Sequence, residues 1–123
     1  MEELTKKEEE VMHAIWKLKQ AFVKDIIEYI DPTQTTPYNT ISSIVRILEK
    51  KGYVGFNAYG KTYQYYPLIS KMQYRKFFFS RVMNKYFDDS VENLVSFIVK
   101  EQQISETDIE KIKEIINKNK KDE

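Results

Sequence analysis

Residues 37–67 read PYNTISSIVRILEKKGYVGFNAYGKTYQYYP and predict one helix followed by two short strands. Proline suits the first turn of a helix and glycine its end, so Pro37 and Gly52 bracket the helical segment. The residues beyond Gly52 are mostly aromatic or β-branched on both sides of Gly60, which is typical of a β-hairpin. Pro67 ends the second arm. This order, helix and then hairpin, decides the fold prediction.

The predicted helix has two unlike faces. Its apolar residues recur every three or four positions and form the face expected to be buried, namely Ile41, Ile44, Val45 and Leu48. The opposite face carries short polar residues and two cations, Asn39, Ser42, Ser43, Arg46 and Lys50, and Tyr38 and Thr40 lie in the first turn. Arginine can donate two hydrogen bonds at once to guanine or to a phosphate, and short polar side chains let a helix enter the major groove. We therefore predict that this face reads DNA, with Lys50, Lys51 and Lys61 as phosphate contacts.

Two shorter helices are predicted upstream of this segment. Thr5 and Glu8 have the spacing of a capping box, and the apolar residues that follow recur at helical spacing to Leu18. A second stripe runs from Val23 to Ile30 and must end before Pro32. Three short helices followed by a hairpin, with basic charge on the third helix and the hairpin, is the order of a winged helix-turn-helix. The expected fold class is mostly α with a small β-hairpin wing.

The chain beyond Ser70 is predicted to be helical again, in three amphipathic segments. These segments carry more large apolar groups than isolated helices leave in water, so they need a partner surface. The simplest partner is a second copy of the chain in a C2 homodimer. We predict a winged-helix domain over residues 1–68 and a helical dimerisation domain over residues 69–123. The predicted dimer contacts are Tyr74, Phe77, Phe78, Val91, Leu94, Phe97, Ile98, Ile112 and Ile116.

Composition excludes several classes of protein. The chain has no cysteine and one histidine, so neither a disulfide framework nor a Cys/His zinc site can form, and we expect no metal or cofactor. It contains no HExxH or GxSxG motif, and the carboxylates of residues 8–10 are expected on an exposed first turn, so we predict no enzyme and no catalytic residue. No apolar run approaches the roughly 20 residues that span a bilayer, which predicts a cytoplasmic protein without membrane insertion.

The net charge of +1 hides an uneven distribution along the chain. Residues 67–87 carry five bases and no acid, whereas residues 88–123 carry ten acids and six bases. A basic centre favours an anionic partner such as nucleic acid or an anionic membrane surface. Tyr63, Tyr65 and Tyr66 on the hairpin could stack on single-stranded RNA, but without an RNP-like motif packing in the core is the favoured interpretation.

The order of the segments LTKKEEEVMHAIW, FVKDIIEYI, TPYNTISSIVRILEKKGYV, KTYQYYPLIS and ISETDIEKIKEIINK resembles the penicillinase-repressor family of bacterial winged-helix repressors. The resemblance covers Leu4 to about Lys118. It implies a homodimer on a palindromic operator of double-stranded DNA that represses a β-lactamase, a related antibiotic-resistance gene or a neighbouring operon. It places the DNA contacts on the helix from Pro37 to Lys51 and on the wing around Gly60 and Lys61.

The same resemblance implies how repression ends. In β-lactam-responsive members, a membrane metalloprotease sensor triggers cleavage on the N-terminal side of a phenylalanine, and the matching segment here is NLVSFIVKEQ, with its bond at Ser96–Phe97. The chain departs from those members at Ser96, where asparagine is common, and at Ser42, where some carry a basic residue. It also lacks the C-terminal cysteine motif of the copper-responsive branch.

Two other functions remain open at this point. Some winged helices dock a protein partner instead of DNA, so the domain could be a protein-interaction module. A repressor that responds to a small molecule is the second alternative.

Overall fold

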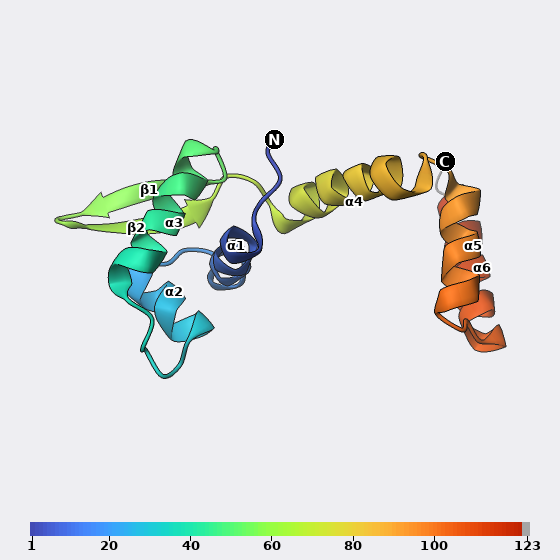
Figure 1. The fold of residues 1–123 in the computed structure, drawn as a ribbon, viewed down its shortest axis with the longest axis horizontal. Coiled ribbons are helices and arrows are strands. Elements are labelled where there is room, and N and C mark those ends of the chain that lie inside the picture. The colour runs from blue at the N-terminus through green and yellow to red at the C-terminus, as the bar shows by residue number, and fades with distance from the viewer. Residues whose placement is uncertain (122–123) are drawn as a thin grey trace. The chain divides into compact units, whose positions relative to one another are not determined.

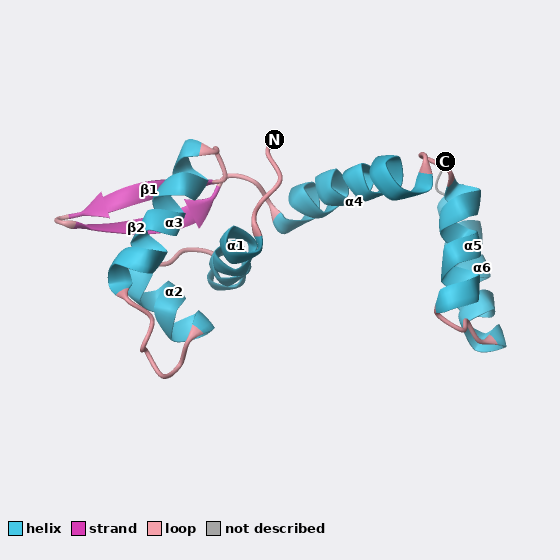
Figure 2. Ribbon diagram, viewed as in Figure 1, coloured by secondary structure: helices cyan, strands magenta, loops and turns pink. Residues whose placement is uncertain are grey.

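The computed structural model describes residues 1–121, which form six helices and one two-stranded hairpin (Figures 1 and 2). The elements are α1 (Lys6–Leu18), α2 (Val23–Ile30), α3 (Tyr38–Lys50), β1 (Val54–Tyr59), β2 (Thr62–Pro67), α4 (Lys71–Phe87), α5 (Val91–Glu101) and α6 (Glu106–Lys121). Three helices followed by a hairpin confirm the predicted winged helix-turn-helix. The chain divides into two compact units, of which the first spans Met1–Phe79 and the second begins at Ser80.

Side-chain caps explain where the helices begin. At the start of α1, the Glu8 backbone N–H donates to the Thr5 hydroxyl at 3.2 Å, and the Thr5 N–H donates to the Glu8 carboxylate at 2.9 Å. The pairs Ser70 with Gln73 and Ser105 with Asp108 repeat this arrangement before α4 and α6. Each pair satisfies two backbone donors that a helix start leaves free. The predicted capping box of Thr5 and Glu8 is therefore confirmed.

The hairpin is antiparallel and joined to the helical part of its unit. Its register pairs Val54 with Pro67 and Tyr59 with Thr62, and Gly60 turns the chain with φ +61°, a conformation that glycine adopts without strain. Ala21, which precedes α2, forms a bridge with Tyr65 through hydrogen bonds of 2.8 and 2.9 Å. This bridge fixes the wing beside the helices.

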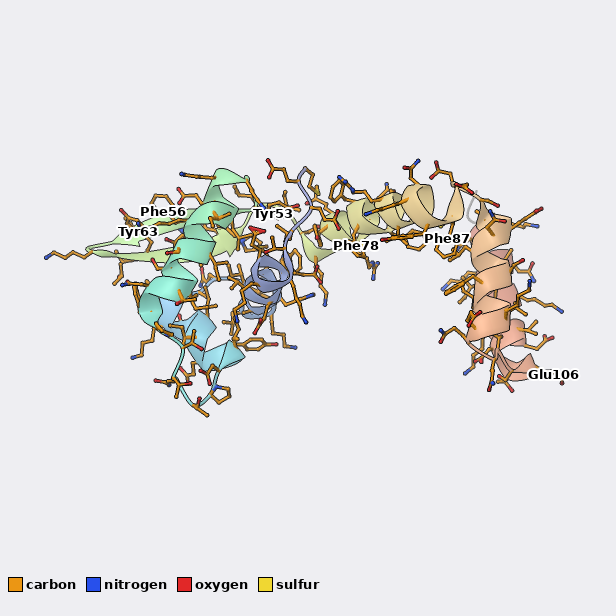
Figure 3. The ribbon with its side chains drawn as sticks, viewed as in Figure 1. Tyr53, Phe56, Tyr63, Phe78, Phe87 and Glu106 are labelled. Carbon is orange, nitrogen blue, oxygen red and sulfur yellow. The ribbon has the colours of Figure 1, made fainter. Side chains whose placement is uncertain are left out.

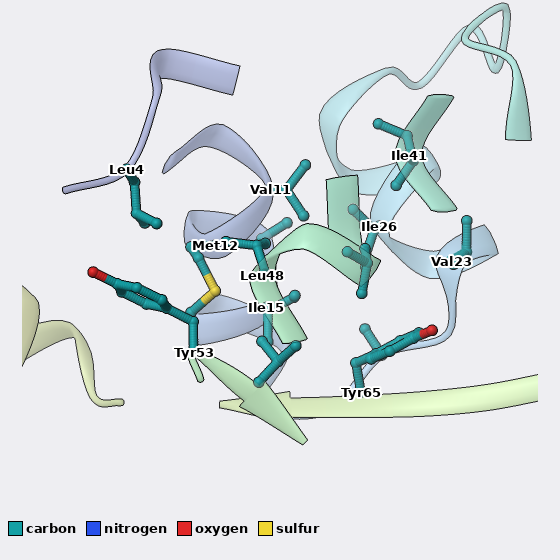
Figure 4. Packing of buried hydrophobic residues seen from close by; sticks show 14 of the residues in the cluster. Leu4, Val11, Met12, Ile15, Val23, Ile26, Ile41, Leu48, Tyr53 and Tyr65 are labelled. Atoms are coloured by element: carbon teal, nitrogen blue, oxygen red, sulfur yellow. The ribbon is translucent and has the colours of Figure 1, made fainter. Parts of the chain in front are cut away.

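The apolar stripes of α1, α2 and α3 meet in one core, which Figure 4 shows from close by. The largest fully buried side chains include Tyr53, Met12, Ile26 and Leu48, from all three helices and the start of the hairpin. Tyr65 on β2 is also buried, whereas Tyr63 is 43% exposed. The predicted core packing of the hairpin tyrosines is thus correct for Tyr65 and wrong for Tyr63, and Tyr66 is half-buried.

The first turns of α4 belong to this core as well. Tyr74 is 5% exposed, its ring centroid lies 5.9 Å from that of Trp16 and 5.8 Å from that of Tyr53, and its hydroxyl accepts a hydrogen bond from the Leu4 N–H at 3.2 Å. Phe77 packs against the same core. The predicted dimer contact is therefore wrong for Tyr74 and for Phe77, because both side chains pack on the core of their own chain. The first unit accordingly runs to Phe79, past the boundary predicted after residue 68.

The second unit buries far less of its apolar surface within one chain. Ser90 caps α5, and the rings of Phe87 and Phe97 meet edge to face at 5.5 Å. No residue of α5 is buried, although it carries six large apolar side chains. On α6, Ile112 and Ile116 are 44% and 49% exposed. None of the helices among residues 1–121 is long and apolar enough to cross a membrane.

Candidate nucleic-acid interface

Helix α3 is held by its inner face, which leaves its outer face free. Ile41, Val45 and Leu48 are at most 1% exposed and anchor the helix in the core. Because side chains on opposite faces of a helix point apart, the predicted reading residues point outward. Tyr38, Asn39, Thr40, Ser43, Arg46 and Lys50 are exposed, and Ser42 is half-buried. The residues that the sequence assigned to DNA are thus accessible.

A hollow of about 300 Å³ lies between α3 and the wing. Arg46 and Lys61 both line it, although the first is on the helix and the second is at the hairpin turn. Three other predicted residues also line it, namely Tyr38, Asn39 and Ser42. The remaining lining residues, Val23, Tyr63 and Tyr65, were not among the predicted DNA contacts. Thr40, Ser43, Lys50 and Lys51 do not line the hollow. Five of the nine predicted DNA-binding residues therefore gather at one place.

Two aromatic rings extend this surface along the wing. Phe56 and Tyr63 are stacked with ring centroids 4.4 Å apart, and Figure 3 shows them side by side on the hairpin. Both are more than a third exposed. Phe56 was not among the predicted site residues. The signal that could have found it is strand register, because Phe56 lies opposite Tyr65 and so on the same face of the hairpin as Tyr63.

The interface is positively charged and can donate hydrogen bonds. Arg46, Lys50 and Lys61 form no ion pair with any residue of 1–121, so their charges are available to a partner. Burial and the Glu49 carboxylate raise the pKa of Tyr65, while Arg46 acts in the opposite direction. The Tyr65 hydroxyl therefore keeps its proton at neutral pH. The arrangement suits a polyanion.

Lys51 has a different role from the predicted phosphate contact. Its ammonium donates to both oxygens of the Glu8 carboxylate at 2.8 and 2.9 Å, and Glu2 lies 3.9 Å away. Glu8 is 5% exposed, which also overturns its prediction as an exposed residue of the first turn. Burial alone would raise the pKa of Glu8, but hydrogen bonds from Lys51 and Thr5 lower it below its ordinary value. This pair ties the end of α3 to α1.

Replacing Lys51 with methionine should lower the free energy of unfolding by about 1 to 3 kcal/mol at neutral pH, because the Glu8 carboxylate then stays buried without its hydrogen-bond donor. The folded-state pKa of Glu8 lies below the ordinary value of 4.5, so the pair stabilises the fold above that pH and this stabilisation is lost as the pH falls through the folded-state pKa. The difference between the two proteins should therefore shrink in acid. Denaturant unfolding at pH 7 and pH 3 measures it, with the exposed Lys50→Met as control. An unchanged difference at pH 3 would contradict the ion pair.

The predicted dimer and cleavage residues lie in the second half of the chain. Val91, Phe97, Ile112 and Ile116 are exposed, and Leu94 and Ile98 are half-buried. On α4, Phe78 is 41% exposed. The Ser96–Phe97 bond lies inside α5. Among residues 1–121, no group of three His, Cys, Asp or Glu side chains is placed to hold a metal ion.

Comparison with known proteins gives a consistent result over nearly the full length. The profile of a protein family described as penicillinase repressor matches residues 4–118. The chain is 30% identical over 116 residues to the methicillin resistance regulatory protein MecI of Staphylococcus aureus (strain N315), which covers 94% of each chain. It is 25% identical over 111 residues to the penicillinase repressor of Bacillus licheniformis, which covers 90% of this chain and 87% of that protein.

Proposed function

Because this chain belongs to the penicillinase repressor family and is a transcriptional repressor, we propose that it binds a palindromic DNA operator as a homodimer and is released by cleavage in its C-terminal region. The observation that carries the DNA-binding part is the convergence of Arg46 and Lys61 on one exposed hollow. Helix α3 enters the major groove, where Arg46 reads a base, and Lys61 on the wing holds a phosphate. Cations without internal partners favour DNA over a protein partner.

Arg46→Ala should weaken operator binding by about 1 to 3 kcal/mol and relax the preference for one base, because a forked contact to guanine is lost. Lys61→Ala should weaken binding to all sequences alike and reduce the salt dependence, because an ammonium contacts phosphate without reading sequence. Fluorescence anisotropy with operator and unrelated duplexes at several salt concentrations separates the two effects. Lys76→Ala, which is exposed but outside the hollow, is the control. Unchanged operator affinity of a folded Arg46→Ala variant would remove Arg46 from the interface.

The apolar side chains of the second unit support the dimer. Its helices leave large apolar groups exposed within one chain, and a second copy offers the same groups in return. The proposed contacts are Val91, Leu94, Phe97, Ile98, Ile112 and Ile116 in this unit, together with Phe78 at the end of the first unit. Dimerisation would place two copies of α3 on half-sites a whole number of helical turns apart.

The proposed cleavage at Ser96–Phe97 requires a local opening. The bond lies within α5, and the Phe97 ring packs edge to face on Phe87, so α5 must unwind before a protease can reach it. Cleavage would detach α6 and part of α5, and with them much of the proposed dimer contact. A membrane metalloprotease sensor is the proposed source of the signal.

Mass spectrometry of the protein recovered from induced and uninduced cells tests this step. We expect fragments that end at Ser96 and begin at Phe97 in induced cells, and an intact chain in uninduced cells. An intact chain in induced cells whose regulated gene is derepressed would exclude release by cleavage.

A further inference from the structure

Two adjoining depressions, of about 640 and 230 Å³, lie between the outer face of α1 and the beginning of α4. His13, Trp16 and Lys71 line both, so the depressions form one continuous surface. All of these residues belong to the first compact unit. None of them lines the hollow between α3 and the wing. This surface is therefore separate from the proposed DNA interface.

The floor of this surface is aromatic. The ring centroids of His13 and Trp16 lie 5.4 Å apart in an edge-to-face arrangement, and those of Trp16 and Tyr74 lie 5.9 Å apart. Tyr74 is buried and the Trp16 indole N–H donates to the Ile69 carbonyl at 2.8 Å, so both rings are held in place before any ligand arrives. Fixed rings offer stacked and edge-on contacts to another planar ring at little cost in conformational entropy.

Cations surround the aromatic floor. Lys17 lines the larger depression, Arg75 lines the smaller one, and Lys71 lines both. None of the three forms an ion pair with any residue of 1–121. Glu9 is the acid among the lining residues, and its carboxylate lies 3.5 Å from His13 Nε2. Three cations against one carboxylate leave the surface positive, which favours an anionic ligand.

We propose that this surface binds a small planar aromatic anion, such as an aryl carboxylate. The ring packs against His13 and Trp16, and the carboxylate contacts Lys71 and Arg75, of which arginine can donate two parallel hydrogen bonds to it. The proposal explains cations of the basic stretch at residues 67–87 that the DNA interface does not use. The proposed ligand site does not depend on the proposed cleavage at Ser96–Phe97.

The single tryptophan makes the test direct, because the full chain has one indole N–H signal in a ¹⁵N–¹H NMR spectrum. Titration with 2-naphthoate should shift that signal saturably with a Kd of about 1 mM or tighter, as expected for a ligand of this size in an open site. The neutral analogue 2-naphthalenemethanol should bind at least about 3-fold more weakly. No saturable shift, or equal affinity for the neutral analogue, would overturn the proposal.

A matched pair of variants tests the role of the cations. Replacing both Lys71 and Arg75 with glutamine should weaken 2-naphthoate binding by about 3-fold to 10-fold, because each exposed ion pair contributes modestly. Lys76→Gln, on the same helix but outside both depressions, should leave the affinity unchanged. An equal loss in Lys76→Gln would mean a general charge effect and would overturn the site. A random-sequence duplex that shifts the Trp16 signal when 2-naphthoate does not would assign the surface to DNA instead.

Discussion

A fragment that ends at Phe79 should bind a single half-site as well as the full chain does, yet lose about 100-fold to 10,000-fold in affinity for a complete operator. Joining two binding domains makes the second contact intramolecular, and the fragment loses that gain in effective concentration. The fragment keeps its own fold, because Tyr74 and Phe77 remain in the core of the first unit. Anisotropy with duplexes that carry one or two half-sites, together with sedimentation of both proteins, measures the effect.

A shorter fragment serves as the control for folding. A fragment ending at Pro67 lacks Tyr74 and should be less stable than the fragment ending at Phe79, so weak binding by the shorter one alone would report unfolding. If the fragment ending at Phe79 binds the complete operator as tightly as the full chain, residues 80–123 do not make the functional dimer.

Tyr74→Ala should lower the free energy of unfolding of the 1–79 fragment by about 3 to 5 kcal/mol, the usual cost of removing a large buried ring. The substitution removes the ring contacts to Trp16 and Tyr53 and leaves the Leu4 N–H without its acceptor. Urea unfolding measures the change. Tyr74→Phe keeps the ring and should cost only about 1 kcal/mol for the lost hydrogen bond.

Phe78, which lies four residues further along α4, is the matched control. It is 41% exposed, so Phe78→Ala should change the stability of the same fragment by less than about 1 kcal/mol. In the full chain, the same substitution should weaken the proposed dimer. Equal destabilisation of the fragment by Tyr74→Ala and Phe78→Ala would contradict the assignment of Tyr74 to the core.

Features encoded over a few residues could be predicted from the sequence. The capping pair of Thr5 and Glu8 needs only a spacing of three, and the end of α2 before Pro32 follows from the geometry of one residue. The inner stripe of α3 follows from helical periodicity alone. These local patterns fix the order of the elements, and that order is enough to indicate a winged helix-turn-helix.

Features that join distant parts of the chain could not be predicted in the same way. Glu8 and Lys51 are separated by 43 positions, so no local pattern identifies Lys51 as the partner of a buried carboxylate. Tyr74 and Phe78 lie on one stripe of α4, and periodicity shows that the stripe is buried without showing whether its own chain or a second copy covers each residue. The structure separates the two, because Tyr74 meets Trp16 within the first unit while Phe78 stays exposed.

Selection of the full chain's binding site from a library of random DNA duplexes tests the central claim most directly. The result we predict is an inverted repeat whose two half-sites have centres a whole number of helical turns apart, at about 34 to 36 Å per turn. The Arg46→Ala variant should select a repeat with a relaxed base at one symmetric position. Enrichment of a single unrepeated motif, or no enrichment at all, would contradict a dimeric repressor that reads DNA through α3.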